Sequence, residues 1–188
     1  MLHLRIIIGD NDEKFLINTS SQLKNMGYNV VDTDTSGTSL IRKIRSLKPD
    51  AVLVDVNLKG ISGFEISNIV EGEGICPCII MLKTNPSEYA VKLQQKLIYA
   101  YLQKPLIISN VEYVIDNAYI SFKKIIELNR EIKERKTIEK AKGFLMKNYN
   151  MSEEKAYEYI RKKSMDKSIS MYKVALAIID IINKKEDL

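Results

Sequence analysis

Two aspartates and a lysine, far apart in the sequence, have the residue types and positions needed to receive a phosphoryl group. Asp10 and Asn11 follow one apolar run, Asp55 ends another, and Lys104 follows a third, just before Pro105. Oxygen donors beside a central aspartate suit Mg²⁺. An aspartate beside a divalent cation and a lysine can accept a phosphoryl group, because both cations neutralise charge on the transferring oxygens. These residues therefore predict a phosphoacceptor site, provided that the fold brings them together.

The elements that must position these side chains alternate between strand and helix over residues 1 to about 105. Short apolar runs, each typical of a strand covered on both faces, lie at 4–8, 30–32, 51–55, 78–82 and 98–102. Helical patterns separate them near 13–26, 37–47, 63–71 and 87–95. This alternation predicts an α/β fold with a five-stranded, parallel, doubly wound sheet. In such sheets the functional site lies at the carboxyl ends of the strands.

The segments DVNLKGISGFE, at 55–65, and YLQKP, at 101–105, resemble the receiver domain of two-component response regulators. The resemblance covers about residues 3–120, and we assign 1–120 to this domain. It implies a sensor histidine kinase as partner and Mg²⁺ as cofactor. The implied roles are phosphoacceptor for Asp55, metal ligands for Asp10, Asn11, Asp55 and the backbone carbonyl of Asn57, phosphoryl contact for Lys104, and a rotamer switch for Tyr101.

Two positions depart from the receiver pattern. Receivers usually carry a second carboxylate where Asn11 stands, and an uncharged amide oxygen predicts weaker Mg²⁺ binding. The small hydroxyl residue expected after the fourth strand is Lys83, and Thr84 replaces it only if the strand end shifts by one residue. Lys83 could pair with the phosphoryl group, or it could hold Asp55 without phosphate. The second case would make this a degenerate, locked receiver.

A single long helix is predicted over 109–140, because no Pro or Gly occurs from Ser109 through Lys142. Apolar residues recur in alternating steps of four and three, which indicates a coiled-coil-like connecting helix over 109–137. A polar Asn at a seam position fixes the register of two helices. The alternative is that the first half packs on the receiver as its fifth helix, and both arrangements can coexist. We expect dimerisation of the active protein through Ile115, Phe122, Ile125, Asn129 and Ile132.

The last third of the chain contains three short amphipathic segments and all of the excess positive charge. From Arg130 to the end there are 15 Lys and Arg against 10 Asp and Glu, a net charge of +5, whereas residues 1–129 are neutral. Ser152, followed by two glutamates, predicts a helix start, and Ser170 predicts another. The pattern predicts a small all-α unit of three helices over 130–188 with a polyanionic partner.

The strings IEKAKGFLM, SEEKAYEYIRKKSM and VALAI resemble the ANTAR domain, an RNA-binding module of transcription antiterminators. The resemblance implies binding of paired RNA hairpins in a leader transcript, which blocks a competing terminator. Arg161 can form paired hydrogen bonds with its planar guanidinium group, and Lys142 stands in the matched segment. The candidate RNA contacts are Lys142, Lys147, Tyr157, Arg161, Lys162 and Lys163, although core packing is the stronger interpretation for Tyr157.

Two other function classes remain open from the sequence. One is a DNA-binding response regulator, although the third C-terminal helix is too apolar for a good groove reader. The other is a phosphate-shuttling receiver without nucleic acid, which would have no use for the basic tail. No apolar run is long enough for a membrane span, no secretory signal is evident, and the two cysteines predict buried thiols. We expect a cytoplasmic regulator that is not an enzyme beyond its own phosphoryl transfer.

Overall fold

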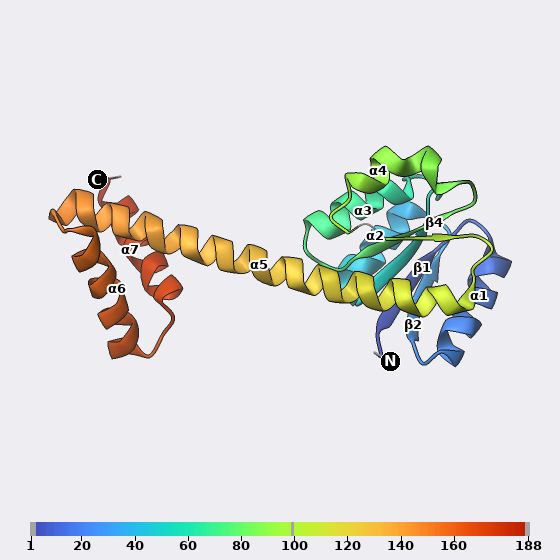
Figure 1. The fold of residues 1–188 in the computed structure, drawn as a ribbon, viewed down its shortest axis with the longest axis horizontal. Helices are drawn as coiled ribbons and strands as arrows, with labels where there is room; N and C mark the ends of the chain where they lie inside the picture. The colour runs from blue at the N-terminus through green and yellow to red at the C-terminus, as the bar shows by residue number, and fades with distance from the viewer. Residues whose placement is uncertain (1–2, 99, 187–188) are drawn as a thin grey trace. The chain divides into compact units, whose positions relative to one another are not determined.

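The computed structural model describes residues 3–98 and 100–186, with side chains described up to residue 182. The chain divides into two compact units, Met1–Ile125 and Ile126–Leu188. Figure 1 shows a sheet with surrounding helices in the first unit and helices alone in the second.

The first unit contains a parallel sheet of five strands in the order β2-β1-β3-β4-β5. The strands are β1 (Arg5–Gly9), β2 (Asn29–Asp34), β3 (Ala51–Asp55), β4 (Cys78–Leu82) and β5 (Tyr101–Gln103). This sheet confirms the predicted fold class. The predicted bounds of the fifth strand, 98–102, are wrong at the start, and Tyr99 lies outside the described residues. Ile98 is not part of the strand, since its backbone N–H donates to the Glu71 carboxylate at 3.4 Å.

The helices of the first unit begin at residues that can satisfy their free backbone N–H groups. Asp12 caps α1 by accepting from the N–H groups of Lys14 and Phe15, at 2.9 and 3.1 Å. Ser62 and Glu65 form a capping box at the start of α3. The helices are α1 (Glu13–Asn25), α2 (Gly37–Leu47), α3 (Gly63–Gly72), the 3₁₀ turn η1 (Pro86–Tyr89), α4 (Ala90–Gln94) and the first part of α5 (Ile108–Tyr149).

Helices α2, α3 and α4 cover one face of the sheet. Their buried side chains form a single core with every second residue of the strands, as the alternation of strand side chains requires. The intervening strand residues, such as Ile8 and Met81, are equally buried and point to the opposite face. Both faces of the sheet are therefore covered, which leaves the strand ends as the accessible edge.

The beginning of α5 belongs to the receiver core and not to a dimer seam. Ile115 is fully buried and Phe122 is 2% exposed. The Tyr28 hydroxyl donates to Asp116 at 2.9 Å, which joins α5 to the segment between α1 and β2. The expectation that Ile115 and Phe122 form a dimer seam is therefore wrong for this conformation, because both side chains are already enclosed by their own chain.

The second unit packs the end of α5 against α6 (Glu153–Lys167) and α7 (Met171–Glu186). Its small core is formed by apolar residues from all three predicted segments, among them Leu145, Ile160 and Val174, and the first of these segments is the last part of α5. Ser152 caps α6 by accepting from the Lys155 N–H at 3.3 Å. The Ser164 hydroxyl donates to the Ile169 carbonyl at 2.5 Å, which fixes the turn between α6 and α7. Within the part of the chain that the structure describes, none of the helices is long and apolar enough to cross a membrane.

Candidate functional site

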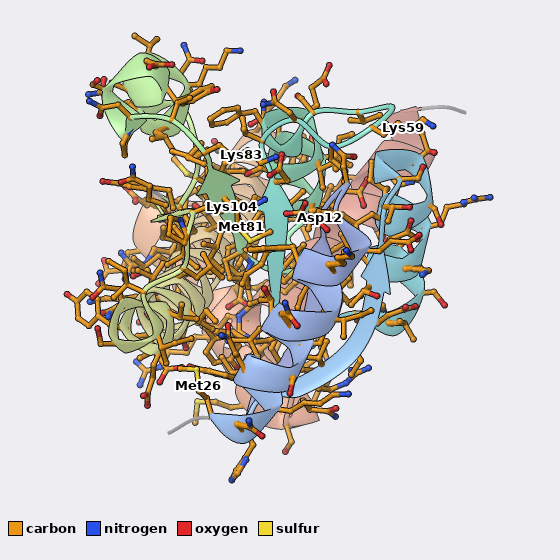
Figure 2. The ribbon with its side chains drawn as sticks, turned by 90° about the vertical axis from the view of Figure 1, so that its right-hand side faces the viewer. Asp12, Met26, Lys59, Met81, Lys83 and Lys104 are labelled. Carbon is orange, nitrogen blue, oxygen red and sulfur yellow. The ribbon has the colours of Figure 1, made fainter. Side chains whose placement is uncertain are left out.

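The predicted convergence of Asp10, Asp55 and Lys104 occurs at the carboxyl end of the sheet. Asp10 follows β1, Asp55 ends β3, and Lys104 comes directly after β5. In Figure 2, Lys104, Lys83 and Asp12 lie toward one end of the sheet, and Met26 lies toward the other. Gly63 allows this packing, since a Cβ there would lie 2.6 Å from the Asp55 carbonyl oxygen. The parallel sheet therefore assembles the site from three separate strands.

Lys104 joins the two aspartates. Its ammonium group donates to Oδ2 of Asp10 and to Oδ2 of Asp55, and all three side chains are at most 9% exposed. The same ammonium group lies 4.3 Å from the centre of the Phe15 ring, a cation–π contact. Buried charges are tolerated in proteins when they are paired, and here two carboxylates share one cation. One negative charge therefore remains uncompensated within this trio.

Backbone donors orient the remaining carboxylate oxygens. Oδ1 of Asp55 accepts from the Asn57 N–H at 2.8 Å, and Oδ1 of Asp10 accepts from the Asp12 N–H at 3.0 Å. Each aspartate thus has one oxygen on a backbone amide and one on Lys104. This arrangement presents the Asp55 carboxylate in a fixed orientation near the strand edge, as a phosphoacceptor requires.

The predicted metal ligands differ in how they are engaged. Asp10, Asp55 and the Asn57 carbonyl meet at this edge of the sheet. All three are oxygen donors, the type of ligand that Mg²⁺ prefers, so these residues could hold the cation. Asn11, in contrast, bonds to the backbone of the β3–α3 loop, with its amide nitrogen 2.6 Å from the Asn57 carbonyl oxygen. No cluster of three or more His, Cys, Asp or Glu side chains suited to a metal ion occurs among the residues that the structure describes.

Lys83 and Thr84 follow β4, and Tyr101 is the first residue of β5. β4 ends at Leu82, so Lys83 and not Thr84 occupies the position of the expected hydroxyl residue, and both are exposed. Lys83 and Lys104 line the same surface hollow. Lys104, and not Lys83, holds Asp55, which corrects the alternative of an Asp55–Lys83 pair. Tyr101 is half-buried and packs against the core.

A buried ion pair that the residue pattern did not predict anchors the segment before β5. The ammonium group of Lys96 donates to Glu71 at 2.9 Å, to the Cys78 carbonyl at 2.6 Å and to the Ser67 hydroxyl. Glu71 also accepts from the Cys78 N–H at 2.9 Å. This network ties α3 to β4 and to the chain that leads to Lys104. Neither residue stands in a pattern that distinguishes it from an ordinary surface charge, so the sequence gives no signal for it.

Lys142, a predicted RNA contact, is held inside the second unit. Its ammonium group lies 2.9 Å from carboxylate oxygens of both Glu139 and Glu153, and its side chain is 9% exposed. The hydrogen bonds that Lys142 donates to Glu153 and to Glu139 raise the pKa of Lys142, and the bond to Glu153 lowers the pKa of that carboxyl group. Lys142 therefore joins the end of α5 to the start of α6, and its charge is already balanced by carboxylates.

The other predicted RNA contacts are exposed. Arg161, Lys162 and Lys163 lie on α6, and Lys147 lies near the end of α5. Tyr157 is 44% exposed, so the prediction that it packs in the core is wrong. Within the segment 138–146, a Cβ added at Gly143 would meet nothing within 4 Å, so a neighbouring helix of this chain does not explain that glycine.

Two of the predicted seam residues remain accessible in the second unit. Ile132 is 49% exposed and Asn129 is exposed, and both line a shallow groove on α5. Ile125, at the end of the first unit, is half-buried. The accessible part of the heptad pattern therefore begins at about Ile125, C-terminal to the residues enclosed by the receiver.

Comparison with protein families gives two matches that together span most of the chain. Residues 6–116 match the response regulator receiver domain, and residues 127–179 match the ANTAR domain. The receiver domain of the response regulator NarL from Mycobacterium tuberculosis superposes with a TM-score of 0.56 at 22% identity, over 63% of this chain and 98% of that one. A receiver domain from Pseudomonas aeruginosa, solved with magnesium in its active-site cleft, gives a TM-score of 0.55 at 17% identity, over 63% of this chain and 98% of that one. A DNA-binding response regulator from Staphylococcus aureus gives a TM-score of 0.55 at 18% identity, over 62% of this chain and 98% of that one.

Curated relatives extend the similarity over both units. The transcriptional regulatory protein PdtaR of Mycobacterium tuberculosis is 24% identical over 190 residues, which cover 97% of this chain and 93% of that protein. The nitrate regulatory protein of Klebsiella oxytoca is 40% identical over 57 residues, 30% of this chain and 14% of that protein. The site geometry, the two domain matches and this full-length relative agree: the chain belongs to the response regulators and consists of a receiver domain followed by an ANTAR domain.

Proposed function

We propose that this protein is a transcription antiterminator whose ANTAR unit binds paired RNA hairpins in leader transcripts under the control of its receiver. The ANTAR match and the full-length similarity to a transcriptional regulatory protein support this function. The observation that carries it is the exposed group of cations on α6, Arg161, Lys162 and Lys163, in the part of the chain that holds the whole net charge of +5. Such a surface attracts phosphate groups.

The residues divide into phosphate contacts and base contacts. Arg161 is the best candidate for a specific contact, because its guanidinium group can donate two parallel hydrogen bonds to a base edge or a phosphate. Tyr157 is exposed one helical turn before it and can stack on an unpaired loop base. Lys147, Lys162 and Lys163 supply sequence-independent attraction. Lys142 is left out of this set, because Glu139 and Glu153 neutralise it.

The receiver controls this surface through phosphorylation of Asp55 by a sensor histidine kinase. A carboxylate oxygen of Asp55 forms a bond to the phosphorus, and the bond between the phosphorus and the donor histidine nitrogen breaks. Lys104 keeps its contact with Asp10 and neutralises charge on the transferred group. Mg²⁺ bound by Asp10, Asp55 and the Asn57 carbonyl would add further charge neutralisation. Tyr101, packed beside β4, is the side chain that responds to the change at Asp55.

Pairing of two α5 helices then provides the affinity. The candidate seam runs through Asn129 and Ile132, which are exposed, and begins at Ile125, which is half-buried. Two ANTAR units on one dimer each take one hairpin, so the second contact is intramolecular and adds to the first. Replacing Asn129 with aspartate places like charges at the seam. We expect Asn129→Asp to lower the dimer fraction of phosphorylated protein in sedimentation experiments and to weaken binding of the two-hairpin RNA.

The test of the function is fluorescence anisotropy with three labelled ligands: a two-hairpin RNA, a single hairpin, and the duplex DNA of the same sequence. We expect the two-hairpin RNA to bind tightest and the DNA weakest, and Arg161→Ala to reduce RNA affinity. Arg42→Ala removes an exposed arginine of the receiver unit and serves as the matched control. Equal binding of RNA and DNA, or equal effects of the two arginine substitutions, would contradict the proposal.

A separate comparison tests the phosphorylation step. Wild type and Asp55→Asn are treated with acetyl phosphate, and the RNA affinity of each is measured. We expect treatment to tighten binding only for wild type. Tight binding by both proteins, regardless of treatment, would favour a locked receiver that controls RNA binding without phosphate.

Gly143 provides an independent check on the RNA-facing surface. Alanine there has open space and should stabilise the helix by about 1 kcal/mol. We therefore expect Gly143→Ala to raise the thermal stability of the ANTAR unit. A simultaneous loss of RNA affinity would indicate that RNA approaches the backbone at this position.

A further inference from the structure

Asn11 forms a two-sided bond to the loop that follows β3. Its Oδ1 accepts from the Lys59 N–H at 2.9 Å, and its Nδ2 donates to the Asn57 carbonyl oxygen at 2.6 Å. The orientation of the amide is fixed by these partners, because a backbone N–H only donates and a backbone carbonyl only accepts. The side chain therefore bridges the acidic edge at Asp10 and the β3–α3 loop, 46 and 48 residues away in sequence.

This bond engages the backbone carbonyl that a divalent cation would use, and it directs the partial positive charge of the Asn11 amide group at that oxygen. A cation at the acidic edge needs the Asn57 carbonyl together with Asp10 and Asp55, and the Asn57 oxygen already accepts a hydrogen bond at 2.6 Å. The Asn11 oxygen is engaged with Lys59 and does not turn toward the carboxylates. Lys104 already balances one of the two carboxylate charges. The amide thus competes with a cation at this oxygen instead of acting as its ligand.

We propose that Asn11 is a positioning residue that closes the β3–α3 loop through its two backbone partners, and that a divalent cation binds only by displacing its amide from the Asn57 carbonyl. Asn11 thereby sets the cation concentration at which the phosphoacceptor site becomes complete. This inference deepens the proposed function, on which it rests for its biological meaning. Its physical content is cation binding, which can be measured without phosphate or RNA.

Substitution of Asn11 separates a competitor from a ligand, because the two roles predict opposite signs. Alanine at position 11 removes the hydrogen bond to the Asn57 carbonyl, so a competitor role predicts that Mg²⁺ binds about 3- to 10-fold more tightly. A ligand role predicts weaker binding for the same variant. Asn11→Asp keeps an acceptor for the Lys59 N–H, removes the donor and adds a charge, so it should tighten binding more than alanine does.

The measurement is isothermal titration of MgCl₂ into full-length wild type, Asn11→Ala, Asn11→Asp and Asn68→Ala at constant ionic strength. Asn68 is an exposed asparagine on α3 and serves as the matched control. We expect the order Asn11→Asp, Asn11→Ala, and then wild type equal to Asn68→Ala. Unchanged or weaker binding by Asn11→Ala, with its circular dichroism spectrum intact, would overturn the proposal.

A second measurement uses wild type alone and does not depend on any variant folding. In ¹H–¹⁵N spectra the Asn11 side-chain amide should shift as Mg²⁺ is titrated, with the same midpoint as the calorimetric curve, because the cation displaces it. Saturable Mg²⁺ binding that leaves this amide signal in place would also refute the inference. Failure of RNA binding or of Asp55 phosphorylation changes neither readout, so the two proposals fail separately.

Discussion

Removal of the Lys96 ammonium group should destabilise the receiver unit by about 3–5 kcal/mol, because it leaves a buried carboxylate without its cation. The side chains of Lys96 and Glu71 are 1% and 2% exposed. Methionine fills a similar volume but donates no hydrogen bond. In Lys96→Met, the Glu71 carboxylate would keep only the backbone donors of Cys78 and Ile98, at 2.9 and 3.4 Å. Since domains are stable by roughly 5–15 kcal/mol, this loss is a large fraction of the total.

The assay is urea unfolding followed by pulsed hydrogen exchange and mass spectrometry, which reports peptides of the two units separately. We expect a lower urea midpoint for peptides of β4 and β5 and an unchanged midpoint for α6 and α7. The double variant Lys96→Met/Glu71→Gln removes the unpaired charge and should recover much of the loss. Lys14→Met, at an exposed position of α1, controls for loss of a surface charge.

Two outcomes would refute this reasoning. One is a loss below about 1 kcal/mol for Lys96→Met, which is the range of an exposed ion pair. The other is a double variant as unstable as the single one, which would mean that the unpaired carboxylate is not the source of the loss.

Three further predictions test the core, the second unit and the thiols. Phe122 is buried, so Phe122→Ala should lower the free energy of unfolding of the receiver by about 3–5 kcal/mol in urea. Ile132 is half-exposed, so Ile132→Ala should leave the unfolding of the receiver unchanged and should only reduce dimerisation in sedimentation experiments. Glu153→Gln should lower the thermal midpoint of the ANTAR unit at neutral pH. The bond to Lys142 lowers the pKa of Glu153 in the folded state, so the stabilisation by this ion pair is present above the pKa of the unfolded state and is lost as pH falls through the folded pKa. A difference in thermal midpoint between wild type and Glu153→Gln that persists at pH 2 would contradict this account. Burial raises the pKa of the Cys78 thiol to about 12, so thiol-reactive reagents should label it in urea and not in native protein.

The sequence was sufficient for the sheet and for the convergence of the three side chains of the candidate site. Continuous apolar runs predict strands because a strand covered on both faces has no polar side, and parallel strands bring their carboxyl ends to one edge. Asp10, Asp55 and Lys104 could therefore be grouped before any contact was known. The start of β5 could not be predicted, because the partner of the Ile98 N–H is a carboxylate from α3 and not a neighbouring strand.

The heptad pattern of α5 is compatible with two different packing partners. Steps of three and four place apolar residues on one face, and that face can pack on a receiver or on a second helix. Burial distinguishes the two cases: Phe122 is enclosed and Ile132 is half-exposed. The pattern alone carries no information about which neighbour is present.

What the sequence by itself determined is the order of elements, the identity of the two domains and the concentration of positive charge in the second. The order of elements and the charge distribution follow from residue types and local spacing, which do not depend on distant contacts, and the identity of the domains follows from the resemblance of their segments to known families. Only the tertiary structure decided how individual charges and amides are engaged. Asn11 bonds to a loop 46 residues away, and Lys142 pairs with two carboxylates. Such pairings depend on distances between side chains that the fold brings together, and residue type alone does not specify them.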